Sequence, residues 1–119
     1  MDGTTVETVS TNHGIMLGPG TFIPGQVGQA FDTDQGAACI QVPASSSLNV
    51  GAGDRLTIEC WINPATVSGA GPVVEWNLPN DGNAYGTHLW ASIPNQAPGV
   101  LFANLVDLNG DWHAIAAPA

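Results

Sequence analysis

Short runs in which apolar and polar residues alternate follow one another along most of this chain, separated by Gly, Pro, Asn and Asp. Alternation with a period of two, bounded by such residues, is typical of β-strands joined by turns. The clearest run covers residues 56–63, where Leu56, Ile58, Cys60 and Ile62 recur at every second position. The other predicted strands cover residues 15–17, 21–23, 27–33, 38–43, 72–78, 87–93, 100–108 and 111–117.

No window of about a dozen residues keeps apolar side chains at i, i+3, i+4 and i+7 without an interrupting Gly or Pro. We therefore predict no α-helix. About eight short strands separated by regular turns are typical of an antiparallel β-sandwich or jelly roll. The dipeptide Asn109-Gly110, between the last two predicted strands, indicates a two-residue hairpin turn. The pattern thus predicts an all-β, antiparallel fold.

The two cysteines lie in predicted strands, and strand parity places them on opposite sides. Cys39 has the opposite parity to Ile40, whereas Cys60 has the same parity as Ile58. If the aliphatic faces of both strands point to the core, Cys60 lies inside and Cys39 outside. A disulfide needs closely placed Cβ atoms, so we expect these two thiols to stay unpaired.

Length and charge limit the number of domains and the kinds of partner that we expect. The chain has 119 residues, which we interpret as a single domain at residues 1–119, and 44% of them are apolar, enough for a core. The net charge is −9, and Arg55 is the only Lys or Arg, so neither nucleic acid nor an anionic membrane surface is an expected partner. No apolar run is long enough to insert into a membrane, and the N-terminus lacks the features of a signal peptide.

Four local patterns between residues 12 and 64 carry a family resemblance when taken in order. They are Asn12-His13-Gly14, Gly25-x-x-Gly28-x-Ala30-Phe31, Ile40-x-Val42-Pro43 followed by Ser47-Leu48, and the run from Leu56 through Trp61 to Pro64. Together they resemble the laminin G-like, concanavalin A-like jelly-roll family. The resemblance implies an antiparallel β-sandwich in which Leu48 plugs one end and Trp61 lies on a core strand.

The chain departs from this family at two places. It has Asp32-Thr33-Asp34-Gln35-Gly36 where family members usually carry Asp-Gly, and it lacks a recognisable set of closing strands. We therefore expect residues 1–119 to cover the N-terminal half to two-thirds of the family domain. An incomplete sandwich exposes a sheet edge. The expectation is then that a neighbouring chain, or a second copy in a homo-oligomer, covers that edge, or that the chain is a fragment of a longer exported protein.

Catalysis finds little support in the residue pattern. The glucanases of this fold carry a Glu-x-Asp-x-(x)-Glu motif on one strand, and no such motif occurs here. Glu59 and Glu75 are the only acids in mid-strand positions, and glycoside hydrolysis requires two positioned carboxylates. No Gly-x-Ser-x-Gly motif and no close Cys or His spacing indicates a nucleophile or a zinc site. We expect the protein not to be an enzyme.

Oxygen-rich turns make Ca²⁺ the best candidate cofactor. Asp32 and Asp34 lie two residues apart in one turn, and hard carboxylate and carbonyl oxygens are the ligands that Ca²⁺ prefers. Residues 107–111 and 80–83 form two further turns of this kind. Asp and Asn are also common turn formers without any metal, and that alternative stays open.

Aromatic residues beside polar ones mark a candidate sugar-binding site, because sugars stack on aromatic rings while amides and carboxylates bind their hydroxyl groups. The candidate ligand-binding residues are Glu75, Trp76, Tyr85, His88 and Trp90. The resemblance implies a non-catalytic, extracellular or cell-surface module that binds a glycan or an extracellular protein, with help from Ca²⁺. The alternatives are an assembly unit completed by strands of a neighbouring chain and a degenerate relative of glycoside hydrolases.

Overall fold

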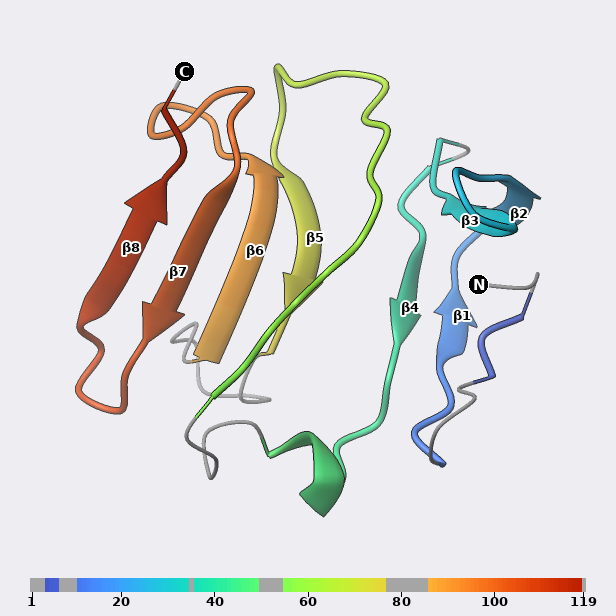
Figure 1. Cartoon of the computed structure of the whole chain (residues 1–119), viewed down its shortest axis with the longest axis horizontal. Coiled ribbons are helices and arrows are strands. Elements are labelled where there is room, and N and C mark those ends of the chain that lie inside the picture. Colours follow the sequence, from blue (N-terminus) through green and yellow to red (C-terminus); the bar gives the residue numbers. More distant parts are fainter. Residues whose placement is uncertain (1–3, 7–10, 35, 50–54, 77–85, 119) are drawn as a thin grey trace. The chain divides into compact units, whose positions relative to one another are not determined.

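The computed structural model shows an all-β chain (Figure 1). It describes residues 4–6, 11–34, 36–49, 55–76 and 86–118. Every strand pair in this part of the chain is antiparallel, and the only helical element is one 3₁₀ turn. These features confirm the predicted all-β, antiparallel class and are consistent with a β-sandwich. The described residues contain no helix long and apolar enough to cross a membrane.

Contacts along the backbone divide the chain into two units, Met1–Ile62 and Asn63–Ala119. The first unit contains two small sheets. In one of them β1 (Ile15–Leu17) pairs with β4 (Cys39–Gln41), and Met16 lies opposite Ile40. The central residue of each strand is half-buried and its neighbours are exposed, which places Cys39 outside, as strand parity predicts.

The second small sheet is a hairpin of β2 (Thr21–Pro24) and β3 (Gln29–Asp32). The N–H of Gly25 donates to the carbonyl of Gly28 at 3.0 Å, and Gly28 has a φ of 62°, a conformation that favours glycine. Phe22 and Phe31 lie directly opposite each other with ring centroids 5.8 Å apart. Such a tilted aromatic pair contributes about 0.5–1.5 kcal/mol beyond its buried area.

The 3₁₀ turn η1 (Ser46–Leu48) lies in the loop where the sequence predicts an apolar plug, and Leu48 is half-buried. Ser45, which precedes this turn, and Ser47 within it both bond to Asn12. The amide of Asn12 donates to Ser47 Oγ at 2.8 Å, and Ser45 Oγ donates to Asn12 Oδ1 at 2.6 Å. Two of the motifs that carry the family resemblance are therefore joined by side-chain hydrogen bonds.

The prediction of a core strand at residues 56–63 is wrong for this structure. Residues 55–70 belong to no strand, and Trp61 is 75% exposed. Cys60, predicted to lie inside, is exposed, and both cysteines are free. An alternating segment is suited to a β-strand, but the strand forms only when a neighbouring strand supplies its backbone hydrogen bonds. No described residue supplies them for this segment.

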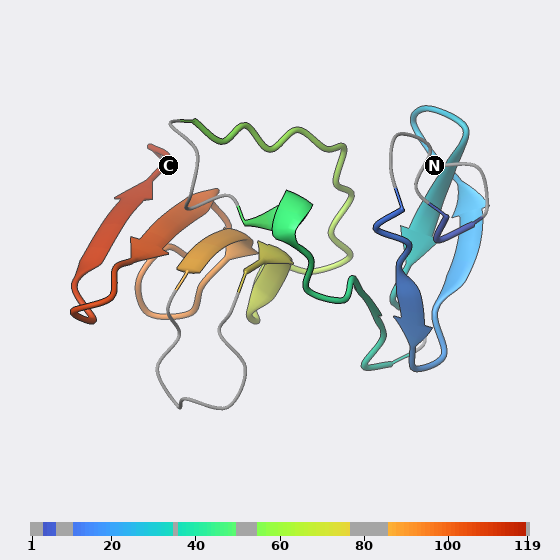
Figure 2. The same ribbon diagram turned by 90° about the horizontal axis from the view of Figure 1, so that it is seen from below.

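The second unit contains a four-stranded antiparallel sheet in the order β5 (Gly71–Glu75), β6 (Gly86–Ser92), β7 (Phe102–Val106), β8 (Trp112–Ala116). Figure 2 shows the same four strands, in the same order, from below. Alternation in the sequence predicts all four strands, although the predicted ranges of β7 and β8 are longer and that of β6 is shifted by one residue. The strand β5 carries a bulge around Pro72, where its register against β6 shifts.

The connection between β6 and β7 turns at Pro94-Asn95, between the predicted strands 87–93 and 100–108. The N–H of Gln96 donates to the carbonyl of Ile93, and Asn95 has a φ of 65°. Proline followed by a residue with positive φ is the arrangement of a type II turn.

The hairpin between β7 and β8 is confirmed, but its loop is longer than the predicted two-residue turn. Asp107 and Asp111 form the closing backbone pair, which leaves three residues in the loop, and Gly110 has a φ of 86°. A type I turn followed by a left-handed glycine is the common three-residue solution. It lets the right-handed twist continue from one strand to the next.

Candidate functional site

One face of the four-stranded sheet carries a row of polar residues across three strands. Side chains alternate between the faces of a strand, so residues that pair directly share a face. Glu75 on β5 pairs with His88 on β6, and His88 pairs with Asn104 on β7. We call Glu75, His88 and Asn104 the polar row. Trp90 lies on the same face, two residues from His88.

Exposure falls along the polar row from the edge of the sheet inward. Glu75 is exposed, His88 is 6% exposed and Asn104 is 4% exposed. The Asn104 side-chain oxygen Oδ1 is buried and has no hydrogen-bond partner within the described part of the chain. A buried acceptor without a partner costs about 1–3 kcal/mol.

Ser92, on the same face, is a buried polar residue whose hydroxyl group has hydrogen-bond partners. Ser92 is 2% exposed, and its Oγ donates to the carbonyl of Val67 at 2.7 Å and accepts from the N–H of Gly99 at 3.0 Å. These bonds fasten the segment before β5 and the loop after β6 to the end of β6. Ser92 therefore has a structural task, whereas the oxygen of Asn104 has none among the described residues.

The structure brings together three of the five predicted ligand-binding residues. Glu75, His88 and Trp90 share one face of the sheet. Trp76 follows Glu75 directly and its N–H donates to the carbonyl of Thr87, so strand alternation places its side chain on the opposite face. Tyr85 lies outside the described residues.

Asn104 is the residue that the sequence-based prediction missed. It has the same parity as Phe102 and Val106, both of which are buried. A polar side chain at an apolar parity is a sign of a buried polar group, and such groups need a partner. The alternation within residues 102–106 is therefore the signal in the sequence that identifies this position.

The turn with the predicted metal ligands is held by its own hydrogen bonds. The N–H of Asp34 donates to Asp32 Oδ1 at 2.9 Å, and the N–H of Gly36 donates to the carbonyl of Thr33. Within the residues that the structure describes, no three His, Cys, Asp or Glu side chains lie close enough together to hold a metal ion. The Ca²⁺ site stays a prediction, and the turn at residues 80–83 lies outside the described residues.

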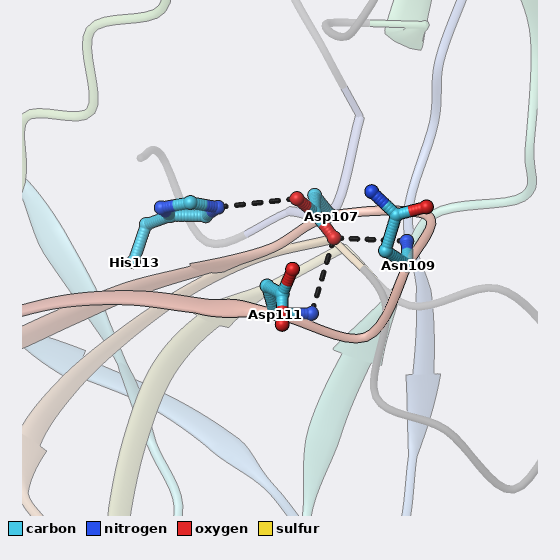
Figure 3. A network of polar contacts seen from close by, with 4 residues as sticks. All are labelled: Asp107, Asn109, Asp111 and His113. Atoms are coloured by element: carbon cyan, nitrogen blue, oxygen red, sulfur yellow. Dashed lines mark hydrogen bonds and ion pairs between the residues drawn. The ribbon is translucent and has the colours of Figure 1, made fainter.

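The oxygen-rich turn at residues 107–111 is organised around one carboxylate (Figure 3). Asp107 Oδ1 accepts from the N–H of Asn109 at 2.8 Å and of Asp111 at 3.1 Å, and Oδ2 lies 3.2 Å from His113 Nε2. The hydrogen bond from His113, followed by those from the two amides, holds the pKa of Asp107 below its ordinary value, although partial desolvation acts in the opposite direction. The carboxylate closes the hairpin, as turn-forming Asp residues commonly do.

Compared with protein-family models, with curated proteins and with solved structures, the chain matches none. The class that the structure itself defines is an all-β chain with antiparallel sheets, and the finer assignment to laminin G-like jelly rolls is a proposal from sequence motifs.

Proposed function

We propose that this chain is a non-catalytic binding module of the laminin G-like jelly-roll type that takes a neutral glycan at the polar row. The observation that carries the proposal is the buried Oδ1 of Asn104, which has no hydrogen-bond partner among the described residues and lies in line with His88 and Glu75. A sugar hydroxyl that donates to this oxygen removes the cost of the buried acceptor. Trp90, half-buried on the same face, offers an aromatic surface to a pyranose ring.

Charge favours a neutral ligand over an anionic one. The strands β5–β8 contain one carboxylate, Glu75, and no Lys or Arg. The whole chain has a net charge of −9, which repels anions at distances within the screening length. Neutral sugars donate hydroxyl hydrogens to carboxylate and amide oxygens without this penalty. We expect the ligand to enter beside the exposed Glu75 and to reach inward along the row.

Binding is favoured over hydrolysis because these strands supply a single acid. Glycoside hydrolysis needs a second carboxylate at a defined separation. Glu59, the other candidate acid, belongs to the first unit, where it is exposed.

Titration calorimetry with a panel of neutral oligosaccharides tests the proposal, with Asn104→Leu and Trp90→Leu as the informative variants. We expect at least one oligosaccharide to bind, and Asn104→Leu to weaken binding about tenfold, the effect of one lost hydrogen bond at a buried site. The matched control is Trp76→Leu, which removes an indole from the opposite face and should leave affinity unchanged. Binding that is absent across the panel, or insensitive to Asn104→Leu, contradicts the proposal.

A second candidate function is assembly by strand addition. The observation that favours it is the segment of residues 56–62, which alternates as far as Cys60 but belongs to no strand and exposes Trp61 and Ile62. Such a segment is suited to a strand supplied by a neighbouring chain. Ca²⁺ at Asp32 and Asp34 and an extracellular or cell-surface location remain part of the proposal that the family resemblance implies.

A further inference from the structure

The two edges of the four-stranded sheet are built differently. The edge strand β5 has Pro72, which lacks an N–H, a bulge at the same place and the exposed charge of Glu75. Proline, bulges and charges are the devices that keep a sheet edge from pairing with another chain. The opposite edge strand β8 has no proline, no bulge in its pairing with β7 and no acidic or basic residue other than His113.

Within the described part of the chain, no strand pairs with the outer side of β8. All five of its residues are exposed, with Trp112 at 57% and Ile115 at 72%. Asp107 and Ala117 donate their N–H groups to the carbonyls of Asp111 and Leu101, so the odd-numbered residues of β8 form the hydrogen-bonded pairs with β7. The N–H and C=O groups of Trp112, Ala114 and Ala116 therefore point to the open edge.

We propose that β8 is a homodimer edge, at which β8 of a second copy pairs antiparallel about a two-fold axis at Ala114. Ala114 is the middle residue of the strand, so this register uses every outward-pointing backbone group and forms about six hydrogen bonds. It places the bulky Trp112 of each copy opposite the small Ala116 of the other. It also places Ile115 opposite His113, and Ala114 opposite its own copy.

Charge favours the antiparallel orientation of the two β8 strands over a parallel one. Each copy carries Asp107 and Asp111 at one end of β8, and two acidic chains repel where such groups approach. An antiparallel pair places the two acidic turns at opposite ends of the joined sheet, whereas a parallel pair places them side by side. This inference is independent of glycan binding, because the polar row lies on β5–β7 and the dimer forms without a ligand.

The oligomeric state is tested by sedimentation velocity on the full chain over a range of concentrations, with Ala114→Pro as the key variant. Proline at position 114 removes an N–H that points away from β7, so the monomer should stay folded by circular dichroism. We expect a concentration-dependent dimer for the unmodified chain and a dissociation constant raised about tenfold or more by the substitution. The control is Ile115→Pro, which removes an N–H bonded to β7 and should instead disrupt the hairpin.

The register is tested by cross-linking in a Cys39→Ser, Cys60→Ser background. Ala114→Cys should form an intermolecular disulfide on mild oxidation, because the two residues meet at the two-fold axis. Leu108→Cys, at the 83% exposed tip of the hairpin, should not, because the two tips lie roughly 30 Å apart across the antiparallel pair.

A chain that stays monomeric at all concentrations overturns the proposal. So does a dimer that Ala114→Pro leaves intact, or one that cross-links through Leu108→Cys and not through Ala114→Cys. A dimer that Ala114→Pro weakens and that cross-links through Ala114→Cys supports both the edge and the register.

Discussion

At the scale of single residues, two buried polar side chains of the second unit differ in their hydrogen bonding. Ser92 both donates and accepts a hydrogen bond, and its position on β6 fixes the segments on either side of it. Asn104 is buried to a similar degree but keeps an acceptor without a partner among the described residues. Natural folds rarely keep such a group without a use, which is why this residue directs the functional proposal.

Replacing Asn104 by leucine should stabilise the unliganded protein. Leucine fills a similar volume and removes the unsatisfied acceptor, so we expect the free energy of unfolding to rise by about 1 kcal/mol. The matched change Ser92→Ala should lower it by about 1–2 kcal/mol, since it leaves the carbonyl of Val67 and the N–H of Gly99 unbonded. Urea denaturation of both variants gives the comparison. If Asn104→Leu is as destabilising as Ser92→Ala, the amide oxygen is bonded after all.

The carboxylate of Asp107 makes the β7–β8 hairpin sensitive to acid. Its pKa is lowered from 3.8 in the folded protein, so the unfolded chain binds a proton more readily and acid favours unfolding. The stabilisation is complete above pH 3.8 and is lost as the pH falls through the lower, folded-state pKa. Thermal unfolding between about pH 2 and 6 should show the difference between the unmodified chain and Asp107→Ala shrinking as the pH falls through that interval.

The control for Asp107 is Asp111→Ala. Asp111 contributes its backbone N–H to the turn, and a substitution of its side chain leaves that donor in place. An acid dependence that disappears in Asp111→Ala rather than in Asp107→Ala contradicts this assignment.

At the scale of elements, the sequence pattern locates the strands well because period-two alternation reports directly on half-buried sheets. The pair β1 and β4, the pair β2 and β3, and the four-stranded sheet from β5 to β8 all form where the pattern predicts strands. The pattern fails at residues 56–63. Alternation shows that a segment is suited to a β-strand, but it does not show whether another strand lies beside it. It also predicts the wrong hairpin loop, because Asn109-Gly110 suits both the two-residue and the three-residue turn.

Alanine at position 110 tests the three-residue loop. Gly110 has a φ of 86°, where a Cβ atom is strained, so Gly110→Ala should lower the free energy of unfolding by about 1 kcal/mol. A two-residue type I′ turn would instead require a positive φ at Asn109 as well. The control Gly69→Ala, at a glycine with no neighbouring atom within 4 Å of an added Cβ, should be neutral or slightly stabilising. Equal effects of the two substitutions in calorimetry would rule out the described loop.

At the scale of the whole molecule, charge is the property that sequence alone determines most completely. A net charge of −9 with a single Arg follows from composition and sets which partners can approach. The pairing of the polar row could not be predicted in this way, because it depends on the registers Glu75 to His88 and His88 to Asn104, and a shift of one residue would turn each side chain to the other face.

Salt should strengthen the proposed dimer. Two copies of charge −9 repel each other, and raising the ionic strength from about 0.01 to about 0.15 M shortens the screening length from about 30 to about 8 Å. We expect the dissociation constant to fall over this range in sedimentation equilibrium. A constant that rises with salt would mean that opposite charges hold the copies together, which β8 does not provide.

The placement of Trp76 and Trp90 on opposite faces of one sheet has a spectroscopic consequence. Each indole is half-buried, and each reports on the solvent and the packing of its own face. In a variant that keeps Trp90 as its single tryptophan, the emission wavelength would respond to occupancy of the polar row. In a variant that keeps only Trp76, the emission would respond only to binding on the opposite face of the sheet. The sheet therefore contains a pair of optical reporters, separated by one backbone layer, that can tell which side of the protein a molecule has reached.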